Sequence, residues 1–209
     1  MLYELVAPEG TRIPKGGGEP DSALGYLQTG MTQMLGLRYQ LKEVDYTPAN
    51  FVHADMTPEE FSASMKRREE SMVKMFFRSL GQSMAQQTQM ENRGQEARMI
   101  AAMLDDDREH ALRLLLAEQF SNLDGATLVF GGPDGSTLIT ERNKKALRVL
   151  RKQLDQGKKK IGIFYGAGHL DDMEERMETE FEMRTGEREW LTAWDLRAAS
   201  EDNDSEERP

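Results

Sequence analysis

The sequence predicts an α/β protein with a mixed, largely parallel central sheet flanked by helices. Two observations predict this class. An amphipathic segment, 138–156, stands between the apolar runs 126–130 and 161–165, as in a strand–helix–strand unit with parallel strands. Helical periodicity over 57–122 interrupts the strand-bearing segments, which predicts an inserted helical hairpin.

The N-terminal part is predicted to hold one helix between extended segments. Residues 2–6 are apolar apart from Glu4 and form the first predicted strand. Apolar residues recur at helical spacing over 22–35. Residues 37–44 alternate between apolar and polar side chains, which indicates a half-buried strand or an extended connector, and 50–55 form a short extended piece.

The insert begins with a strong helix-start signal. Thr57 can cap a helix, Pro58 suits a first turn, and Glu60 completes a capping box. One helical face then runs to about residue 84, and a second helix follows a polar break at 86–94. Many of the 14 methionines lie on these helices. A methionine-rich surface can receive varied apolar ligands, but it is more often core.

The C-terminal part is predicted to return to the sheet. Gly157 ends the helix that begins near residue 138, and the strand 161–165 follows. Residues 170–181 form a charged amphipathic helix, and 190–196 a last strand with a large apolar face. Residues 1–198 thus make one predicted domain. The tail, 199–209, is acidic, lacks apolar anchors, and is predicted to be disordered.

Composition excludes several classes of protein. The net charge of −10 argues against a general nucleic-acid binder and against docking on an anionic membrane. The chain has no cysteine, which removes disulfides, thiolate metal sites and cysteine nucleophiles. No apolar run is long enough to span a membrane, and residues 1–10 lack the pattern of a signal peptide. The sequence indicates neither an oligomeric state nor a compartment.

The segment 161–169 is the first candidate site. An apolar strand ends in Gly166, Ala167, Gly168 and His169, and a helix follows. Ligand sites of parallel sheets gather beyond the carboxyl ends of the strands, where the two glycines would let the backbone turn sharply. A helix N-terminus favours the neutral, metal-binding imidazole. The pattern alone favours a helix-cap histidine over a ligand.

Two further residues have open interpretations. Glu4 lies in an apolar strand, where an unpaired carboxylate would be costly to bury. It is a ligand, a general base or a salt-bridge partner of Arg142, and the salt bridge is favoured. Arg142, beside Asn143 at the start of a helix, either clamps a carboxylate or phosphate or is a solvated side chain, and the solvated side chain is favoured.

The other two histidines carry weaker signals. His53 and Asp55 share one face of an extended segment and form either a metal site or, more often, a capping network. His110 stands among acidic residues on a solvated helix face. The chain has no phosphate-binding loop, Ser-His-Asp pattern or HExxH motif.

Taken together, three segments resemble the TraB/PrgY/GumN family, which is related to the Tiki metalloproteases and to erythromycin-esterase- and ChaN-like proteins. They are the strand 2–6 with its glutamate, the helix start 140–143 (Thr-Glu-Arg-Asn), and 164–170 with its Gly-Ala-Gly-His. Their order and spacing match, and so does the helical insert between them. The resemblance covers nearly the whole chain.

The resemblance implies an α/β fold of two related halves, each with one GxxH motif. It implies a divalent metal (manganese, cobalt or zinc) held by His169 and Glu4, and these two residues with Arg142 would be catalytic. Substrate would be bound by Arg142, Asn143, Tyr165, Gly166 and Gly168. The first GxxH of the family precedes the glutamate strand by 20–30 residues. We therefore expect the chain to be truncated at its N-terminus, a secretion signal being lost with the missing part.

Two functions are predicted. The first is a metal-dependent hydrolase of peptides, in which Glu4 is a metal ligand or the base that activates water, and Arg142 stabilises an oxyanion or binds a substrate carboxylate. A catalytic metal needs about three protein ligands, so the form with one GxxH is expected to be inactive. The second is a non-catalytic protein that binds or sequesters short apolar peptides.

Overall fold

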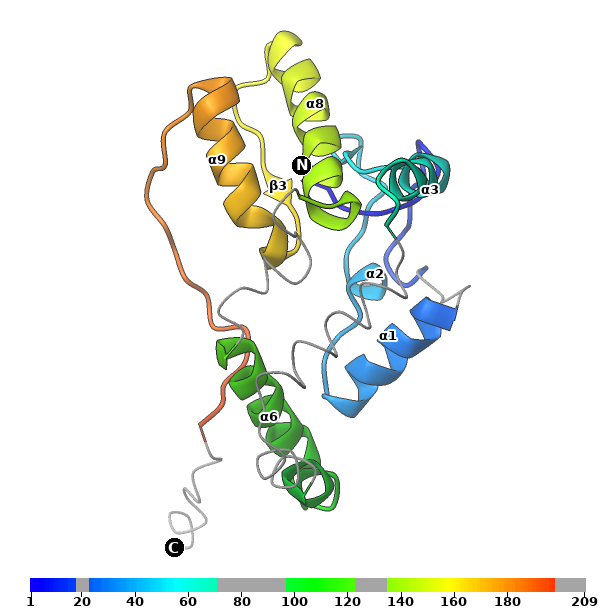
Figure 1. Cartoon of the computed structure of the whole chain (residues 1–209), viewed down its shortest axis with the longest axis vertical. Helices are drawn as coiled ribbons and strands as arrows, with labels where there is room; N and C mark the ends of the chain where they lie inside the picture. The colour runs from blue at the N-terminus through cyan, green and yellow to red at the C-terminus, as the bar shows by residue number, and fades with distance from the viewer. Residues whose placement is uncertain (18–22, 71–96, 123–134, 198–209) are drawn as a thin grey trace, which may run out of the picture.

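The structure is a computed structural model that describes residues 1–17, 23–70, 97–122 and 135–197 (Figure 1). It is an α/β fold with a three-stranded parallel sheet, and most of its regular structure is helical. The strands are β1 (Leu2–Tyr3), β2 (Val52–His53) and β3 (Ile163–Phe164). The α-helices are α1 (Ala23–Met34), α2 (Gln40–Glu43), α3 (Pro58–Arg67), α6 (Arg108–Asn122), α8 (Arg142–Asp155) and α9 (Leu170–Phe181). Two short helices, η1 (Thr137–Glu141) and η2 (Ala167–His169), precede α8 and α9.

The sheet has the order β2-β1-β3, with β1 in the middle and every pairing parallel. Leu2 lies opposite Val52 on one side and Ile163 on the other. Because the strands are parallel, the residues that follow each of them meet at one edge of the sheet. The predicted strands within 2–6 and within 161–165 are confirmed, although each is shorter than predicted, and the extended piece predicted at 50–55 contains β2.

The core beside the sheet joins β1 to helix α8. Leu2, Ala54, Leu147 and Leu150 form a buried cluster, and side chains of α9 pack against it. Figure 1 shows α8 and α9 side by side next to β3. Apolar residues at helical spacing on both helices explain this layer, because each helix buries one face against the strands.

Predicted boundaries of four helices are confirmed. Thr57 Oγ1 accepts the N–H of Glu60, and the Glu60 carboxylate accepts the N–H of Thr57, which is the predicted capping box. Helix α8 ends before Gly157, which adopts a φ of +80°. Helix α9 spans the predicted residues 170–181, and α1 matches the prediction over 22–35 within one residue at each end.

A second apolar cluster lies away from the sheet. Leu35, Ala102 and Leu112 are buried together where the C-terminal end of α1 meets residues 97–103 and α6 (Figure 1). We call this the helical cluster. Three large apolar side chains that line a groove with Leu35 and Leu112 are substantially exposed: Met31, Met34 and Met99.

Three sequence predictions are wrong. Residues 40–43 form helix α2 instead of a strand or connector, because Val44 N–H donates to Gln40 O and closes a helical turn. The second helix of the insert is broken at 104–107, where Asp105 accepts the N–H of Asp107 in an Asx turn. Residues 190–196 form no strand, and Trp190 is 89% exposed. The alternation there matches a strand, but no strand of the described chain pairs with it.

Other predictions fall outside the described residues. These are the helical face beyond residue 70, the polar break at 86–94, the strand 126–130 and the tail 199–209. In the part that is described, no helix is long and apolar enough to cross a membrane.

Candidate functional site

A buried polar centre lies at the carboxyl edge of the sheet. Glu4 follows β1 and Asp55 follows β2, while His169 lies just beyond β3 in η2. Arg142 and Asn143 enter from the first turn of α8. We call these five residues the polar centre. In the described sheet, β2 lies on one side of β1, and β3, the next described strand along the chain, lies on the other. The centre is therefore beyond the carboxyl ends of the strands at the point where the strand order reverses, which is where open α/β sheets usually bind ligands.

Arg142 is the hub of the polar centre. Its Nε donates to Asp55 Oδ1 at 2.9 Å, and its Nη2 to Asp55 Oδ2 and Glu4 Oε1, both at 2.6 Å. Its Nη1 faces Leu138 O. Burial alone would lower the pKa of Arg142, but the two carboxylates outweigh it and raise that pKa. The favoured salt bridge between Glu4 and Arg142 is confirmed, and the solvated alternative for Arg142 is wrong.

Asp55 is the residue of the centre that the sequence reasoning assigned to the wrong partners. Its side chain is fully buried, and Oδ1 also accepts the N–H of Met56 at 2.7 Å. His53 instead places Nε2 2.6 Å from Leu5 O, so the structure does not bring His53 and Asp55 together in one site. The signal that could have identified Asp55 was its place after a strand, equivalent to that of Glu4.

Glu4 has both carboxylate oxygens occupied. Oε1 accepts from Arg142, and Oε2 accepts the N–H of Gly166 at 2.7 Å. Burial by itself would raise the pKa of Glu4. The contact with His169, the charge of Arg142 and the N–H of Gly166 outweigh burial and lower the pKa to about 2. Glu4 is therefore an anion at every physiological pH. Its side chain is 23% exposed, against 9% for that of Arg142.

His169 is buried and held on both sides of its ring. Nδ1 lies 2.6 Å from Asn143 Oδ1, and Nε2 lies 3.4 Å from Glu4 Oε1. The Asn143 amide donates to His169 O at 3.0 Å and to Asp172 Oδ2 at 2.8 Å. The ring is also packed edge-on against Tyr165, with 5.2 Å between centroids. Residues distant in the sequence thus meet at one imidazole.

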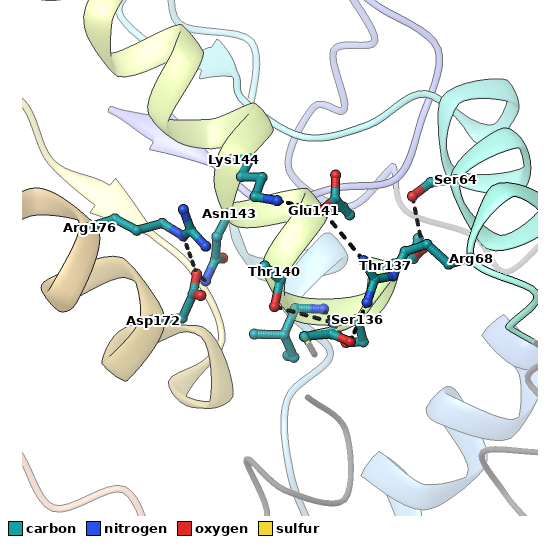
Figure 2. A network of polar contacts seen from close by, with 12 residues as sticks. Ser64, Arg68, Ser136, Thr137, Thr140, Glu141, Asn143, Lys144, Asp172 and Arg176 are labelled. Carbon is teal, nitrogen blue, oxygen red and sulfur yellow. Dashed lines mark hydrogen bonds and ion pairs between the residues drawn. The ribbon is translucent and has the colours of Figure 1, made fainter. Parts of the chain in front are cut away.

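The start of α8 is positioned by a network of hydroxyl and carboxylate contacts (Figure 2). Ser136 caps η1, a π-helical turn, by accepting the N–H of Ile139. Thr137 Oγ1 lies 2.8 Å from Ser64 Oγ of α3, and its N–H donates to the Glu70 carboxylate. These contacts tie η1 to α3, and η1 leads directly into Arg142. π-helical turns are often found at functional sites.

Tyr165 and the glycines differ from the predicted picture. Tyr165 donates its hydroxyl proton to Ala54 O at 2.6 Å, and burial together with the charge of Asp55 raises its pKa. Gly166 and Gly168 both have ordinary backbone angles, and a Cβ at either would meet only atoms at 3.4 Å or beyond. The sharp, glycine-requiring turn predicted there is wrong: the chain turns through the short helix η2. The clear contribution of Gly166 is its N–H.

The described residues do not by themselves fit a metal ion. The candidate donors Glu4 and His169 do lie together, but Glu4 Oε1 is already in contact with a guanidinium. Over residues 1–17, 23–70, 97–122 and 135–197, no group of three or more His, Asp or Glu could hold a metal. Two donors are fewer than the three that a catalytic metal usually has.

Two apolar grooves lie outside the polar centre. One, of about 530 Å³, runs between α9 and residues 183–190 and includes Met173, Met177 and Trp190. The other, of about 230 Å³, borders the helical cluster and includes Met31, Met34 and Met99. Neither groove is lined by a residue of the polar centre. His110, on α6, also lies outside the centre.

Comparison of the chain with models of known protein families, with curated proteins and with solved structures gave no match.

Proposed function

We propose that the chain is a hydrolase of the TraB/GumN type that acts on peptides, with its reacting groups in the polar centre. One observation carries the proposal. The three segments that resemble this family, near positions 4, 142 and 169, converge on a single buried site. Their spacing in the sequence did not require this meeting. The two-half architecture, with a helical insert in a single domain, belongs to the same proposal.

Within the centre, Glu4 acts as a fixed negative charge. A general base works best with a pKa near the operating pH, and the Glu4 pKa of about 2 is far below it. Of its two proposed roles, this favours a ligand or an electrostatic partner over a base. His169 Nε2 faces the same space, and imidazole is the side chain suited to accept a proton near neutral pH.

Arg142 serves the proposed chemistry by holding Glu4. Three of its donor contacts are to Asp55 and Glu4, so little of the guanidinium is left for a substrate. The charge of Arg142 is also more than neutralised by these two carboxylates, so we propose a positioning role for it and not the stabilisation of an oxyanion. A divalent metal remains part of the proposal, but the described residues supply two of its donors and we derive no step through it.

Peptidase turnover tests this function. The purified chain is incubated with a peptide library, with manganese or cobalt added and with both omitted, and cleavage is read by mass spectrometry. We expect turnover that falls at least about a hundredfold in His169→Ala and is unchanged in His110→Ala, a histidine outside the centre. Equal turnover in His169→Ala and the unsubstituted chain would exclude a catalytic role for His169.

A second function is supported by a different observation. The groove beside the helical cluster is lined by methionine and leucine side chains, which adapt to apolar ligands of varied shape. A non-catalytic protein that binds short apolar peptides would use this groove. Binding that persists without metal, without cleavage and in His169→Ala, but is lost in Met34→Asp, would favour this second function.

A further inference from the structure

We infer that Asn143 is a positioning residue that fixes the proton of neutral His169 on Nδ1, so that Nε2 is the bare ring atom presented toward Glu4. The catalytic meaning of this inference rests on the proposed function. The position of the proton is a property of the folded chain alone and can be measured without any activity.

The first step is the orientation of the Asn143 amide. Its nitrogen faces two atoms that can only accept hydrogen bonds, namely His169 O at 3.0 Å and Asp172 Oδ2 at 2.8 Å. Asp172 is itself paired with Arg176, whose Nε donates to the same Oδ2 at 2.9 Å (Figure 2). Turning the amide over would set an oxygen against two acceptors. The Asn143 oxygen therefore faces the imidazole.

The second step is the ring proton. Asn143 Oδ1 has no proton to give, and it lies 2.6 Å from His169 Nδ1. A contact of that length between two bare acceptors would be repulsive, so Nδ1 carries the proton. Both groups are buried, with Asn143 fully inaccessible, and solvent does not offer the ring another partner on this side.

The third step is that Glu4 is the more distant of the two partners of the ring, at 3.4 Å from Nε2 against 2.6 Å between Asn143 Oδ1 and Nδ1. Its Oε1 already accepts from Arg142 and its Oε2 from the Gly166 N–H. The separation of 3.4 Å between His169 Nε2 and Glu4 Oε1 is also longer than an ordinary hydrogen bond. In the neutral ring, Nε2 is thus bare on the side of Glu4, and a proton that Nε2 takes up is held by this carboxylate. That protonated form of the ring is the one whose contact lowers the pKa of Glu4. In the proposed hydrolysis, this bare Nε2 can accept a proton from the attacking water and then return it to the leaving amine of the peptide.

The tautomer is measured by two-bond ¹H–¹⁵N correlation on the full chain labelled with ¹⁵N-histidine, at about pH 8, where ordinary imidazoles are neutral. The chain has three histidines, so His53→Gln and His110→Gln assign the spectrum. We expect His169 to be protonated on Nδ1. In Asn143→Ala the Nδ1 partner is lost, and the ratio of the two tautomers should shift toward Nε2–H by about tenfold. The exposed Asn50→Ala is the matched control and should leave the ratio unchanged.

A proton on Nε2 in the unsubstituted chain would overturn the inference, and so would an unchanged ratio in Asn143→Ala. If Asn143→Ala does not fold, Asp172→Ala tests the same chain of contacts, because the amide then loses the anion that orients it. An Nδ1 proton together with no peptide turnover would refute the proposed function and leave this inference standing. Peptide turnover together with a proton on Nε2 would support the proposed function and refute this inference.

Discussion

The polar centre and the helical cluster are held together by different forces. In the polar centre, buried charges from distant parts of the chain pair directly: Glu4 with Arg142, and Asp55 with Arg142. In the helical cluster, three buried apolar residues border a groove that is lined by exposed methionines, and Arg113 caps Leu35 O at the end of α1. Charge pairs demand one geometry, whereas methionine packing tolerates several. The comparison points to a rigid site beside an adaptable surface.

The largest effect should come from removing Asp55. In Asp55→Ala the buried guanidinium of Arg142 keeps only Glu4 as a charged partner, and breaking such a pair costs about 3–5 kcal/mol. Urea unfolding followed by circular dichroism measures the loss. Asp155→Ala, an exposed aspartate at the end of α8, should change stability by less than about 0.5 kcal/mol. Equal losses for the two variants would mean that the polar centre does not depend on its charges.

The next effect is a pH dependence that belongs to Glu4. Its pKa is about 2 in the folded chain against an ordinary 4.5. A carboxyl with a depressed folded pKa adds stability above its unfolded pKa and loses it as pH falls toward the folded pKa. Between pH 4.5 and about pH 2 the unsubstituted chain should therefore lose roughly 3 kcal/mol more than Glu4→Gln. The exposed Glu9→Gln should keep the full loss, and a matching loss in Glu4→Gln would contradict the assignment.

A matched pair of leucines compares the packing of the two regions. Leu147 beside the sheet and Leu112 in the helical cluster are equally buried, at 3% and 4% exposed. Leucine-to-alanine changes cost about 2–5 kcal/mol, and less where neighbours can move into the space. Methionines around Leu112 can do so, and we expect Leu147→Ala to cost about 1 kcal/mol more than Leu112→Ala. The difference between their urea midpoints measures this, and the opposite order would show that the helical cluster is the more tightly packed region.

The sequence predicted local structure better than it predicted partners. The capping box at Thr57 and the span of α9 depend on neighbouring residues, which a single sequence displays. The salt bridge of Glu4 with Arg142 could be predicted because a buried carboxylate needs a counter-charge.

The pairing of Asp55 could not be predicted in the same way. It depends on the parallel register that brings β2 beside β1, and no local pattern encodes that register. The prediction of a strand at 190–196 was wrong because it depended on the local pattern alone. Alternation shows that a segment can be a strand, but it does not provide a neighbour to pair with.

Two helix caps give the smallest expected effect and show whether the two regions unfold together. Thr57 caps α3 beside the sheet, and Asp107 Oδ1 accepts the N–H of His110 at the start of α6 in the helical cluster. Either change to alanine should cost about 1 kcal/mol, while Thr57→Ser should recover most of the loss. Because the caps are local and alike, any difference between the variants reports on cooperativity and not on the strength of the contact.

If the chain unfolds as one unit, both variants shift a single urea transition by similar amounts. If the adaptable region opens by itself, Asp107→Ala increases hydrogen exchange in α6 and leaves the amides of α8 as protected as before. We expect the second outcome, since buried charge pairs tie α8 to the sheet, whereas the ion pair of Arg98 with Glu118 beside the helical cluster is exposed. Equal loss of protection in α6 and α8 would mean that the rigid site and the adaptable surface form one cooperative unit.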